Sequence, residues 1–200
     1  MNSIKVTSTI KKIPLNYLRS KKITKAILQG FDKFQVHEHF IKEDKIEIES
    51  FERRREIVLE IYRRIISLDT FLQKQLLESD IYTSKFILVY AIAKNDILFR
   101  EFLSEVYRNT LLSAKRYISM DDFRTFFIRK KESYVTVNKW SITTVELLSK
   151  GYRQILTESN LGIRKEKNIY VNRVNIHPIV FNHIKAIGDS SYLQVILGDK

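Results

Sequence analysis

The chain has 200 residues and a mass of 23.8 kDa, the length of one or two domains. It has no cysteine, five glycines and two prolines. Disulfides, thiolate metal sites and cysteine nucleophiles are therefore excluded, and a many-stranded β architecture is disfavoured because it needs frequent turn residues. The net charge is +12, which is typical of proteins that bind nucleic acids.

No segment has the sequence expected of a membrane span. The longest uninterrupted apolar run covers residues 86–93, whereas a helix needs about 20 apolar residues to cross a bilayer. The N-terminus has no apolar stretch typical of a signal peptide. We therefore expect a cytoplasmic protein that does not contact a membrane.

The positive charge is concentrated in two stretches. Residues 1–25 contain seven basic residues and no acids, and residues 124–173 contain eleven basic residues and four acids. Each stretch carries +7, which leaves the other 125 residues with a net charge of −2. This uneven distribution favours two surfaces that bind phosphate, rather than charge spread for solubility.

The N-terminal part begins with residues 1–14, which are polar and basic and which we interpret as a flexible arm. Helical spacing predicts a short helix over 19–30, with Gly30 at its C-terminal end. Residues 32–49 leave two alternatives open. The letters KIEIES alternate like a strand, whereas QVHEHFIKE is compatible with a helix.

A helical bundle is predicted over residues 15–117. An apolar stripe follows Ser50, and Asp69, Asp80 and Asp96 each stand where a side chain would cap a new helix. The expected helices run from residue 50, over 70–78, over about 81–94 and from 96 to about 117. The helix over 81–94 is apolar all round in its middle, so we expect it at the centre of the bundle.

Residues 119–188 change in character, and residues 189–200 are interpreted as a C-terminal tail. A capping box predicts a helix over 119–132, a turn-like segment covers 133–139, and Ser141 caps a helix over 142–158. Two short strands around a turn at 165–168 follow within 161–176, and Pro178 opens a last helix that ends near Gly188. Helix, turn, helix and β-hairpin is the order of a winged helix-turn-helix. The fold class expected is therefore mainly α: a helical bundle followed by a winged helix-turn-helix-like module.

The helix over 142–158 is the candidate recognition helix. Its outward face offers Thr143, Lys150 and Gln154, with Arg153 on the flank, whereas Glu146 would repel phosphate. The hairpin adds further cations, and we expect Lys130 and Lys131 to share one face with Lys150 and the hairpin. The full set of candidate nucleic-acid-binding residues is Arg19, Lys21, Lys22, Lys130, Lys131, Lys139, Thr143, Lys150, Arg153, Gln154, Arg164, Lys165, Lys167 and Arg173.

No pattern in the sequence supports catalysis. It contains no Walker loop, no Gly-x-Gly-x-x-Gly, no Gly-x-Ser-x-Gly and no His-Glu-x-x-His. The four histidines have no spacing suited to a metal, so we expect no metal, no cofactor and no enzymatic activity. Arg53, Arg54 and Arg55 lie between Glu52 and Glu56 and indicate a solvated helix face, with a second nucleic-acid patch as the alternative.

The order of segments resembles a known family. Three successive segments look like the BrxA family of bacteriophage exclusion (BREX) phage-defence systems. They are FERRREIVLEIYRRIISLDTFLQKQLLESD, then AIAKNDILFREFLSEVYRNTLLSAKRYISMDDFRTFF, then VNKWSITTVELLSKGYRQILTESNLG. The resemblance covers roughly residues 15–198, and its most telling pieces are Asp122-Phe123 and Trp140-Ser141. One departure is EDKIEIES at 43–50, which is more acidic than is usual in the family.

The resemblance implies a function that composition alone does not give. It implies a helical protein whose N-terminal bundle is similar to the antitermination factor NusB. It also implies binding to double-stranded DNA and a non-enzymatic role beside the system's methyltransferase, phosphatase-like and ATPase components. Two alternatives remain open at this point: a scaffold whose basic surface docks acidic partners, and an RNA-binding protein similar to NusB.

Overall fold

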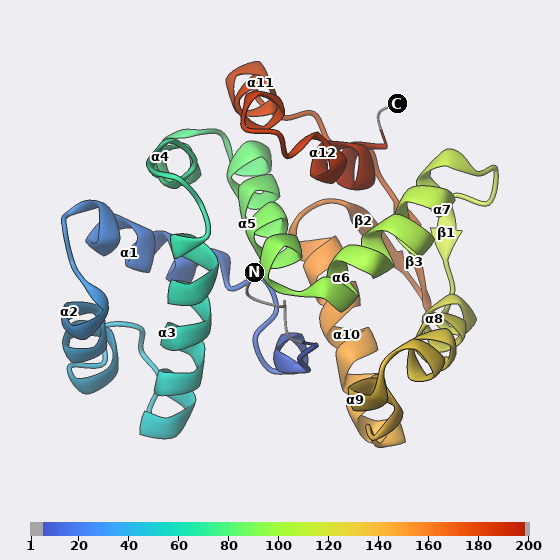
Figure 1. Ribbon diagram of the computed structural model, residues 1–200, viewed down its shortest axis with the longest axis horizontal. Coiled ribbons are helices and arrows are strands. Elements are labelled where there is room, and N and C mark those ends of the chain that lie inside the picture. Colours follow the sequence, from blue (N-terminus) through green and yellow to red (C-terminus); the bar gives the residue numbers. More distant parts are fainter. Residues whose placement is uncertain (1–5, 199–200) are drawn as a thin grey trace.

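A computed structural model describes residues 6–198 as a mainly helical protein with one small sheet, which confirms the predicted fold class (Figure 1). The first helices lie on one side of the molecule and the sheet lies on the other, with α5 between them. In the first half the helices are α1 (Tyr17–Leu28), α2 (Lys33–His37), α3 (Phe51–Ile66), α4 (Thr70–Glu78) and α5 (Ile81–Asn95).

The bundle helices begin at the residues predicted to cap them. Side-chain oxygens of Ser50, Asp69, Asp80 and Asp96 accept hydrogen bonds from backbone N–H groups in the first turn of α3, α4, α5 and α6 (Ile97–Phe102). These bonds satisfy donors that a helix leaves without intrahelical partners. The local sequence thus determines where each helix starts.

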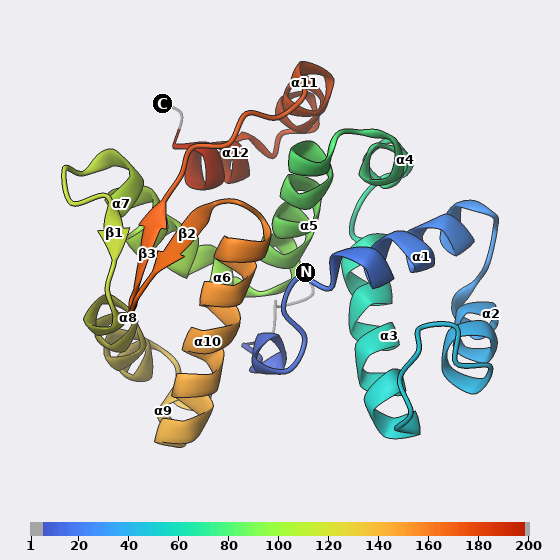
Figure 2. The ribbon, with the colours of Figure 1, turned by 180° about the vertical axis from the view of Figure 1, so that it is seen from behind.

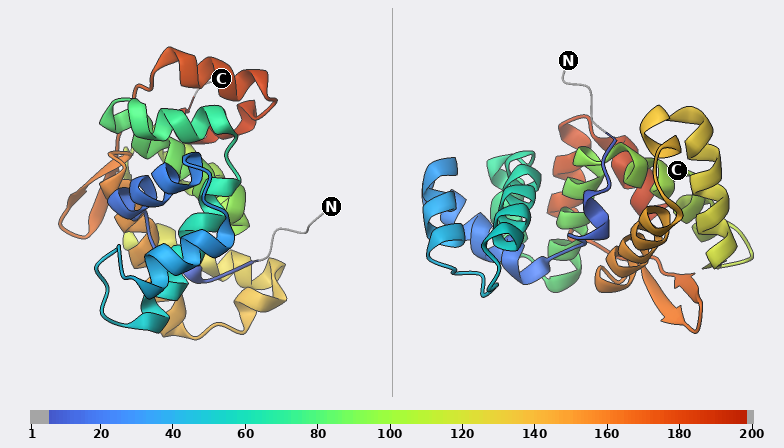
Figure 3. Two further views of the ribbon diagram at one scale, coloured as in Figure 1. Left: turned by 90° about the vertical axis from the view of Figure 1, so that its left-hand side faces the viewer. Right: turned by 90° about the horizontal axis from the view of Figure 1, so that it is seen from below.

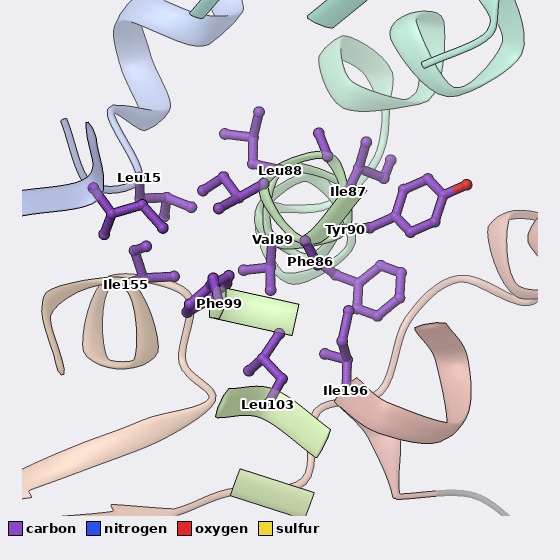
Figure 4. Close-up of a cluster of buried hydrophobic side chains, with 14 of the residues drawn as sticks. Leu15, Phe86, Ile87, Leu88, Val89, Tyr90, Phe99, Leu103, Ile155 and Ile196 are labelled. Carbon is purple, nitrogen blue, oxygen red and sulfur yellow. The ribbon is translucent and has the colours of Figure 1, made fainter. Parts of the chain in front are cut away.

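Helix α5 forms the centre of the core, as its apolar middle predicts. Residues 86–93 are all buried. Figure 4 shows Leu15, Phe99, Ile155 and Ile196, from widely separated parts of the chain, arranged around it. Both predicted domains therefore contribute to one hydrophobic cluster, and their division near residue 118 stays a prediction.

The long helix expected from Asp96 is shorter and less regular than predicted. It continues from α6 through a π-helical stretch (Leu103–Arg108) into α7 (Asn109–Leu112). The chain then forms a strand, β1 (Tyr117–Ile118), instead of continuing as helix to residue 117. The strand pairs with residues about fifty positions later, so no local pattern marks it.

Residues 33–42 follow the helical alternative, whereas the strand alternative for KIEIES is wrong. Asp32 and Gln35 form a capping box that starts α2, which runs into a π-helical turn over Glu38–Lys42. The KIEIES segment pairs with no strand. Instead Arg54 donates to the carbonyl oxygens of Ile41 and Ile48, at 2.7 and 2.5 Å, and so fixes the segment against α3.

The predictions of a flexible arm over residues 1–14 and of a C-terminal tail over residues 189–200 are both wrong for the residues that the structure describes. Residues 9–11 form a 3-10 helix (Thr9–Lys11), and Ile10 and Ile13 are buried. Near the C-terminus α11 (Pro178–Ala186) is followed by α12 (Ser190–Leu197), which buries Leu193 and Ile196. In both segments a few apolar side chains bind the chain to the core. Residues 1–5 and 199–200 lie outside the described part.

The predicted two helices and hairpin are present. Helix α8 (Met120–Ser133) starts at the expected capping box, α9 (Val135–Asn138) is a single helical turn where a turn-like segment was expected, and α10 covers Ile142–Glu158. Strands β2 (Gly162–Lys165) and β3 (Asn168–Val171) pair antiparallel, and β1 adds to β3 in the order β1-β3-β2. The hairpin projects from the body of the protein (Figure 3).

Asp96 makes stability depend on pH. Its side chain is buried and caps α6, and burial raises the pKa of Asp96 to about 6 although Arg64 lies nearby. The folded state therefore holds this proton more tightly than the unfolded chain, and the stabilisation is lost as pH rises through about 6. We expect Asp96→Asn, which keeps the cap, to raise the free energy of unfolding by about 1–3 kcal/mol at pH 8 and to change it little at pH 4.

Urea unfolding of both proteins at pH 4, 6 and 8 checks this expectation. An Asp96→Asn protein that is less stable than the wild type at pH 8 would show that the charged carboxylate stabilises the fold.

Candidate nucleic-acid interface

The exposed stripe of α10 lies between two basic regions of the molecule. Side chains of Leu148, Tyr152 and Ile155 face the core, whereas Thr143, Lys150 and Gln154 are exposed, as predicted. Figure 2 shows the N-terminal segment beside α10 on one side and the hairpin on the other. The basic N-terminal stretch and the basic hairpin, which belongs to the second +7 stretch, therefore lie on opposite sides of the same helix.

A basic cavity of about 760 Å³ lies on the N-terminal flank. It is walled by residues 11–19, by α1, by the start of α3 and by the exposed stripe of α10. Two acids, Glu47 and Glu158, line it. Against them stand seven basic residues: Lys11, Lys12, Arg19, Lys22, Arg53, Lys85 and Lys150.

Several of these cations also hold the cavity together. Lys12 pairs with Glu56 at 2.8 Å, and Arg53 donates to the Lys12 carbonyl oxygen at 2.6 Å. Arg19 donates to the Ile46 carbonyl oxygen at 3.2 Å, and Lys22 pairs with Glu47 at 3.2 Å. The cavity is therefore a cationic surface with a defined shape, although its pairs are solvent-exposed and individually weak.

Helix α10 and the N-terminal segment touch closely. Gly151 is buried, and a Cβ atom there would lie 2.6 Å from the Ile10 carbonyl oxygen. Only glycine permits this approach without a shift of one backbone. The contact brings Lys11 and Lys12 to the same cavity as Lys150.

The hairpin flank carries Arg164, Lys165 and Lys167, all of them exposed. Arg153 points to this side of α10, where its Nη1 lies 3.3 Å from the sulfur of Met120. Burial and the neighbouring charge of Arg164 lower the pKa of Arg153. The Arg153 Nε atom is buried and has no hydrogen-bond partner within residues 6–198. The guanidinium groups of Arg153 and Arg164 together favour the binding of an anion between α10 and the hairpin.

Two predicted residues do not belong to this surface. Lys130 is buried and pairs with Glu101 at 2.8 Å and with Glu105, so it faces the core side of α8. Those two carboxylates raise the pKa of Lys130 against the opposing effect of burial. Lys21 donates to the Leu77 carbonyl oxygen at 3.1 Å and so binds the end of α4. Both cations have a structural partner that the sequence did not indicate.

The other predicted residues remain accessible. Lys139 and Arg173 are exposed, and Lys131 is half-buried. The single face expected for Lys130, Lys131, Lys150 and the hairpin is wrong, because Lys130 is turned inward and because Lys150 and the hairpin lie on opposite flanks of α10. Of the arginine run, Arg53 lines the cavity, whereas Arg54 pairs with Asp44 at 2.9 Å beneath the surface.

Sequence reasoning missed some of the cavity residues. Lys11 and Lys12 belong to the basic N-terminal stretch but were assigned to a flexible arm. Lys85 stands inside the apolar helix α5, where no local pattern marks it, and its Nζ donates to Asn160 at 3.3 Å. Its position in the cavity follows only from the tertiary structure.

Residues 6–198 contain no cluster of three or more His, Asp or Glu side chains that could hold a metal ion. The helices within that range are also too short or too polar to cross a membrane.

Comparisons with known proteins agree on one family. A family model described as BrxA matches residues 6–188. The "BREX protein BrxA" of Bacillus cereus (strain H3081.97) is 32% identical over 192 residues, which cover 96% of each chain. A crystal structure of an uncharacterized protein from Magnetospirillum magneticum superposes with a TM-score of 0.85 at 15% identity, over 97% of this chain and 99% of that one. At this low identity, the likeness to the Magnetospirillum magneticum structure shows the fold alone.

Proposed function

The chain belongs to the BrxA family of BREX phage-defence components, and from that premise we propose that it is a non-enzymatic subunit that binds double-stranded DNA. The proposal assigns the affinity to contacts with phosphates, made from both flanks of α10. The other components of the system, its methyltransferase, phosphatase-like protein and ATPase, are the proposed protein partners.

The order of elements supports a winged helix-turn-helix interpretation. The chain runs β1-α8-α9-α10-β2-β3, and the sheet order is β1-β3-β2. In that module the second long helix enters the major groove and the hairpin contacts the backbone. Here these roles fall to α10 and to the β2–β3 hairpin.

The observation that carries the proposal is the cationic surface on both sides of α10. The basic cavity lies on one flank, and Arg153, Arg164 and Lys167 lie on the other. Duplex DNA presents closely spaced phosphates, so a protein that brings cations to two flanks of one helix gains affinity for any sequence.

The exposed stripe of α10 favours weak discrimination between sequences. It offers Thr143 and Gln154 but no arginine or asparagine in its N-terminal half, and those two residue types make the strongest base contacts. Gln154 already donates to Glu158 at 2.6 Å. We therefore expect binding that is mainly electrostatic.

Changing Lys165 and Lys167 together to Ala tests the hairpin's role. We expect weaker binding to every duplex by a similar factor and a salt slope that is shallower by up to about two, because two phosphate contacts are lost. Fluorescence anisotropy with two unrelated duplexes at several salt concentrations measures both quantities.

Glu146→Gln is the matched control for that experiment. It removes an exposed acid from α10, so affinity should stay the same or rise. Loss of binding to only one duplex in the double lysine variant would instead indicate base readout by the hairpin.

A scaffold for acidic protein partners is the second candidate function. Ile128, Val135 and Ile142 are exposed by 60, 75 and 74% on α8, α9 and the first turn of α10, near the basic residue Lys139. Exposed apolar side chains beside a basic residue fit an acidic protein surface better than a phosphate backbone. Val135→Ser with Ile142→Ser would then weaken co-purification with a BREX component while leaving duplex affinity unchanged.

A further inference from the structure

The sheet has an outward face whose apolar side chains the proposed duplex site does not use. Side chains alternate between the two faces of a strand, so Ile118 and Ile169 face the core while Tyr117 and Tyr170 face outward. Strand pairing sets Tyr117 opposite Tyr170 and Tyr170 opposite Ile163. One row of two aromatic rings and one aliphatic side chain therefore crosses all three strands.

This row is exposed to solvent. Ile163 is 52% and Tyr170 36% exposed, and Tyr117 is half-buried. The two tyrosine rings lie with their centroids 5.5 Å apart and inclined by 38°. Large apolar side chains on the outer face of a small projecting sheet bury little against their own protein, so they favour a ligand with flat apolar surface.

Positively charged side chains lie close to this row of apolar side chains. Lys115 Nζ lies 4.9 Å from the centre of the Tyr117 ring, and Lys165 Nζ lies 5.0 Å from the centre of the Tyr170 ring. Arg116 precedes β1, and Lys167 stands in the hairpin turn. The acids nearby are Asp122, which pairs with Lys115 at 2.6 Å, and Glu166 in the turn. Cations thus outnumber acids around the rings.

We propose that the outer face of the β1-β3-β2 sheet binds single-stranded DNA, with bases stacked on Tyr117 and Tyr170 and phosphates bound by Lys115, Lys165 and Lys167. Unpaired bases expose the flat faces that stack on aromatic rings, and their phosphates complement the surrounding charge. Each ammonium group now over a ring moves to a phosphate when a base takes its place. A base-paired duplex keeps its base faces stacked inside the helix, so it cannot stack on the two tyrosines, although its phosphates would share Lys165 and Lys167 with the single strand.

The choice of DNA rather than RNA rests on the proposed function. Arg164 lies on the face of β2 turned toward α10, whereas Lys165 lies on the outward face, so one hairpin carries cations to both faces. A duplex held by α10 would thus lie next to a surface suited to a strand that has separated from it.

The experiment measures binding of labelled 12-residue oligo-dT, oligo-rU and a hairpin duplex to the full-length protein by anisotropy. We expect Tyr170→Leu and Tyr117→Leu each to weaken oligo-dT binding about tenfold, because each variant loses a ring on which a base stacks. Duplex binding should not change. Tyr170→Phe, which keeps the ring, should bind oligo-dT like the wild type.

Tyr82→Leu is the matched control, because Tyr82 is an exposed tyrosine on α5, away from the sheet. It should bind oligo-dT like the wild type. Thermal unfolding of each variant verifies that the sheet has formed.

The outcomes separate this proposal from the duplex proposal. Oligo-dT binding that is unchanged in both tyrosine variants, or duplex binding that falls equally, overturns the single-strand site. Tighter binding of oligo-rU than of oligo-dT, with the same sensitivity to Tyr170→Leu, overturns the choice of DNA. Tyrosine-dependent oligo-dT binding without any duplex binding overturns the proposed function alone.

Discussion

Replacing Arg64 by Met is expected to lower the free energy of unfolding by about 3–5 kcal/mol. The Arg64 side chain is 2% exposed and pairs with Glu60 at 2.9 Å. It also donates to the carbonyl oxygens of Pro14 and Ile13, at 2.6 and 2.7 Å. Methionine fills similar space but leaves two carbonyl groups without their donor and removes one of the two arginine partners of the Glu60 carboxylate. Urea unfolding of the variant and the wild type measures the difference.

Arg63→Met is the matched control, because Arg63 pairs with the same Glu60 at 2.9 Å but has a side chain 40% exposed. An exposed pair of this kind contributes less than about 1 kcal/mol. Equal losses in the two variants would contradict the view that Arg64 fixes residues 13 and 14 to α3 through buried hydrogen bonds.

Replacing Gly151 by Ala is expected to separate the N-terminal segment from α10. Alanine is the better helix former, but its Cβ would lie 2.6 Å from the Ile10 carbonyl oxygen, so the segment must shift. We expect the free energy of unfolding to fall by about 1–3 kcal/mol, as in other overpacked cores. Because Lys11 and Lys12 move with the segment, duplex affinity should fall by up to about tenfold although no charge has changed.

Unfolding by urea and anisotropy with duplex DNA together check this result, with Gln154→Ala as the control for the unfolding measurement alone. Gln154 is exposed on the same helix, so its replacement should change stability by less than about 0.5 kcal/mol. A Gly151→Ala protein that is destabilised but binds duplex like the wild type would exclude the N-terminal segment from the binding surface.

Features encoded by neighbouring residues could be predicted from the sequence. The caps at Ser50, Asp69 and Asp80, the apolar middle of α5 and the hairpin over 162–171 all depend on a few consecutive residues. Strand β1 could not be predicted, because its two residues become a strand only by pairing with β3. Helix α12 was not predicted, because its apolar residues come after Gly188, which the sequence pattern indicates as the end of the last helix.

The candidate site was predictable in its charge but not in its shape. The two basic stretches are visible in the sequence, whereas their meeting at α10 depends on the contact between Ile10 and Gly151. Lys130 did carry a local signal. It follows Phe123, Phe126 and Phe127 by seven, four and three residues, which is the spacing of the buried face of α8.

The salt dependence of duplex binding by the unmodified protein tests the central claim most directly. Anisotropy titrations with two unrelated duplexes between 50 and 200 mM salt, roughly the range over which phosphate contacts change affinity most, give the slope of log K against log salt concentration. We predict a linear fall with a slope of about −4 or steeper, the same for both duplexes, because several cations on two flanks of α10 each release a counterion. A slope shallower than about −1, or affinities for the two duplexes that differ more than about tenfold, would contradict binding through the phosphate backbone.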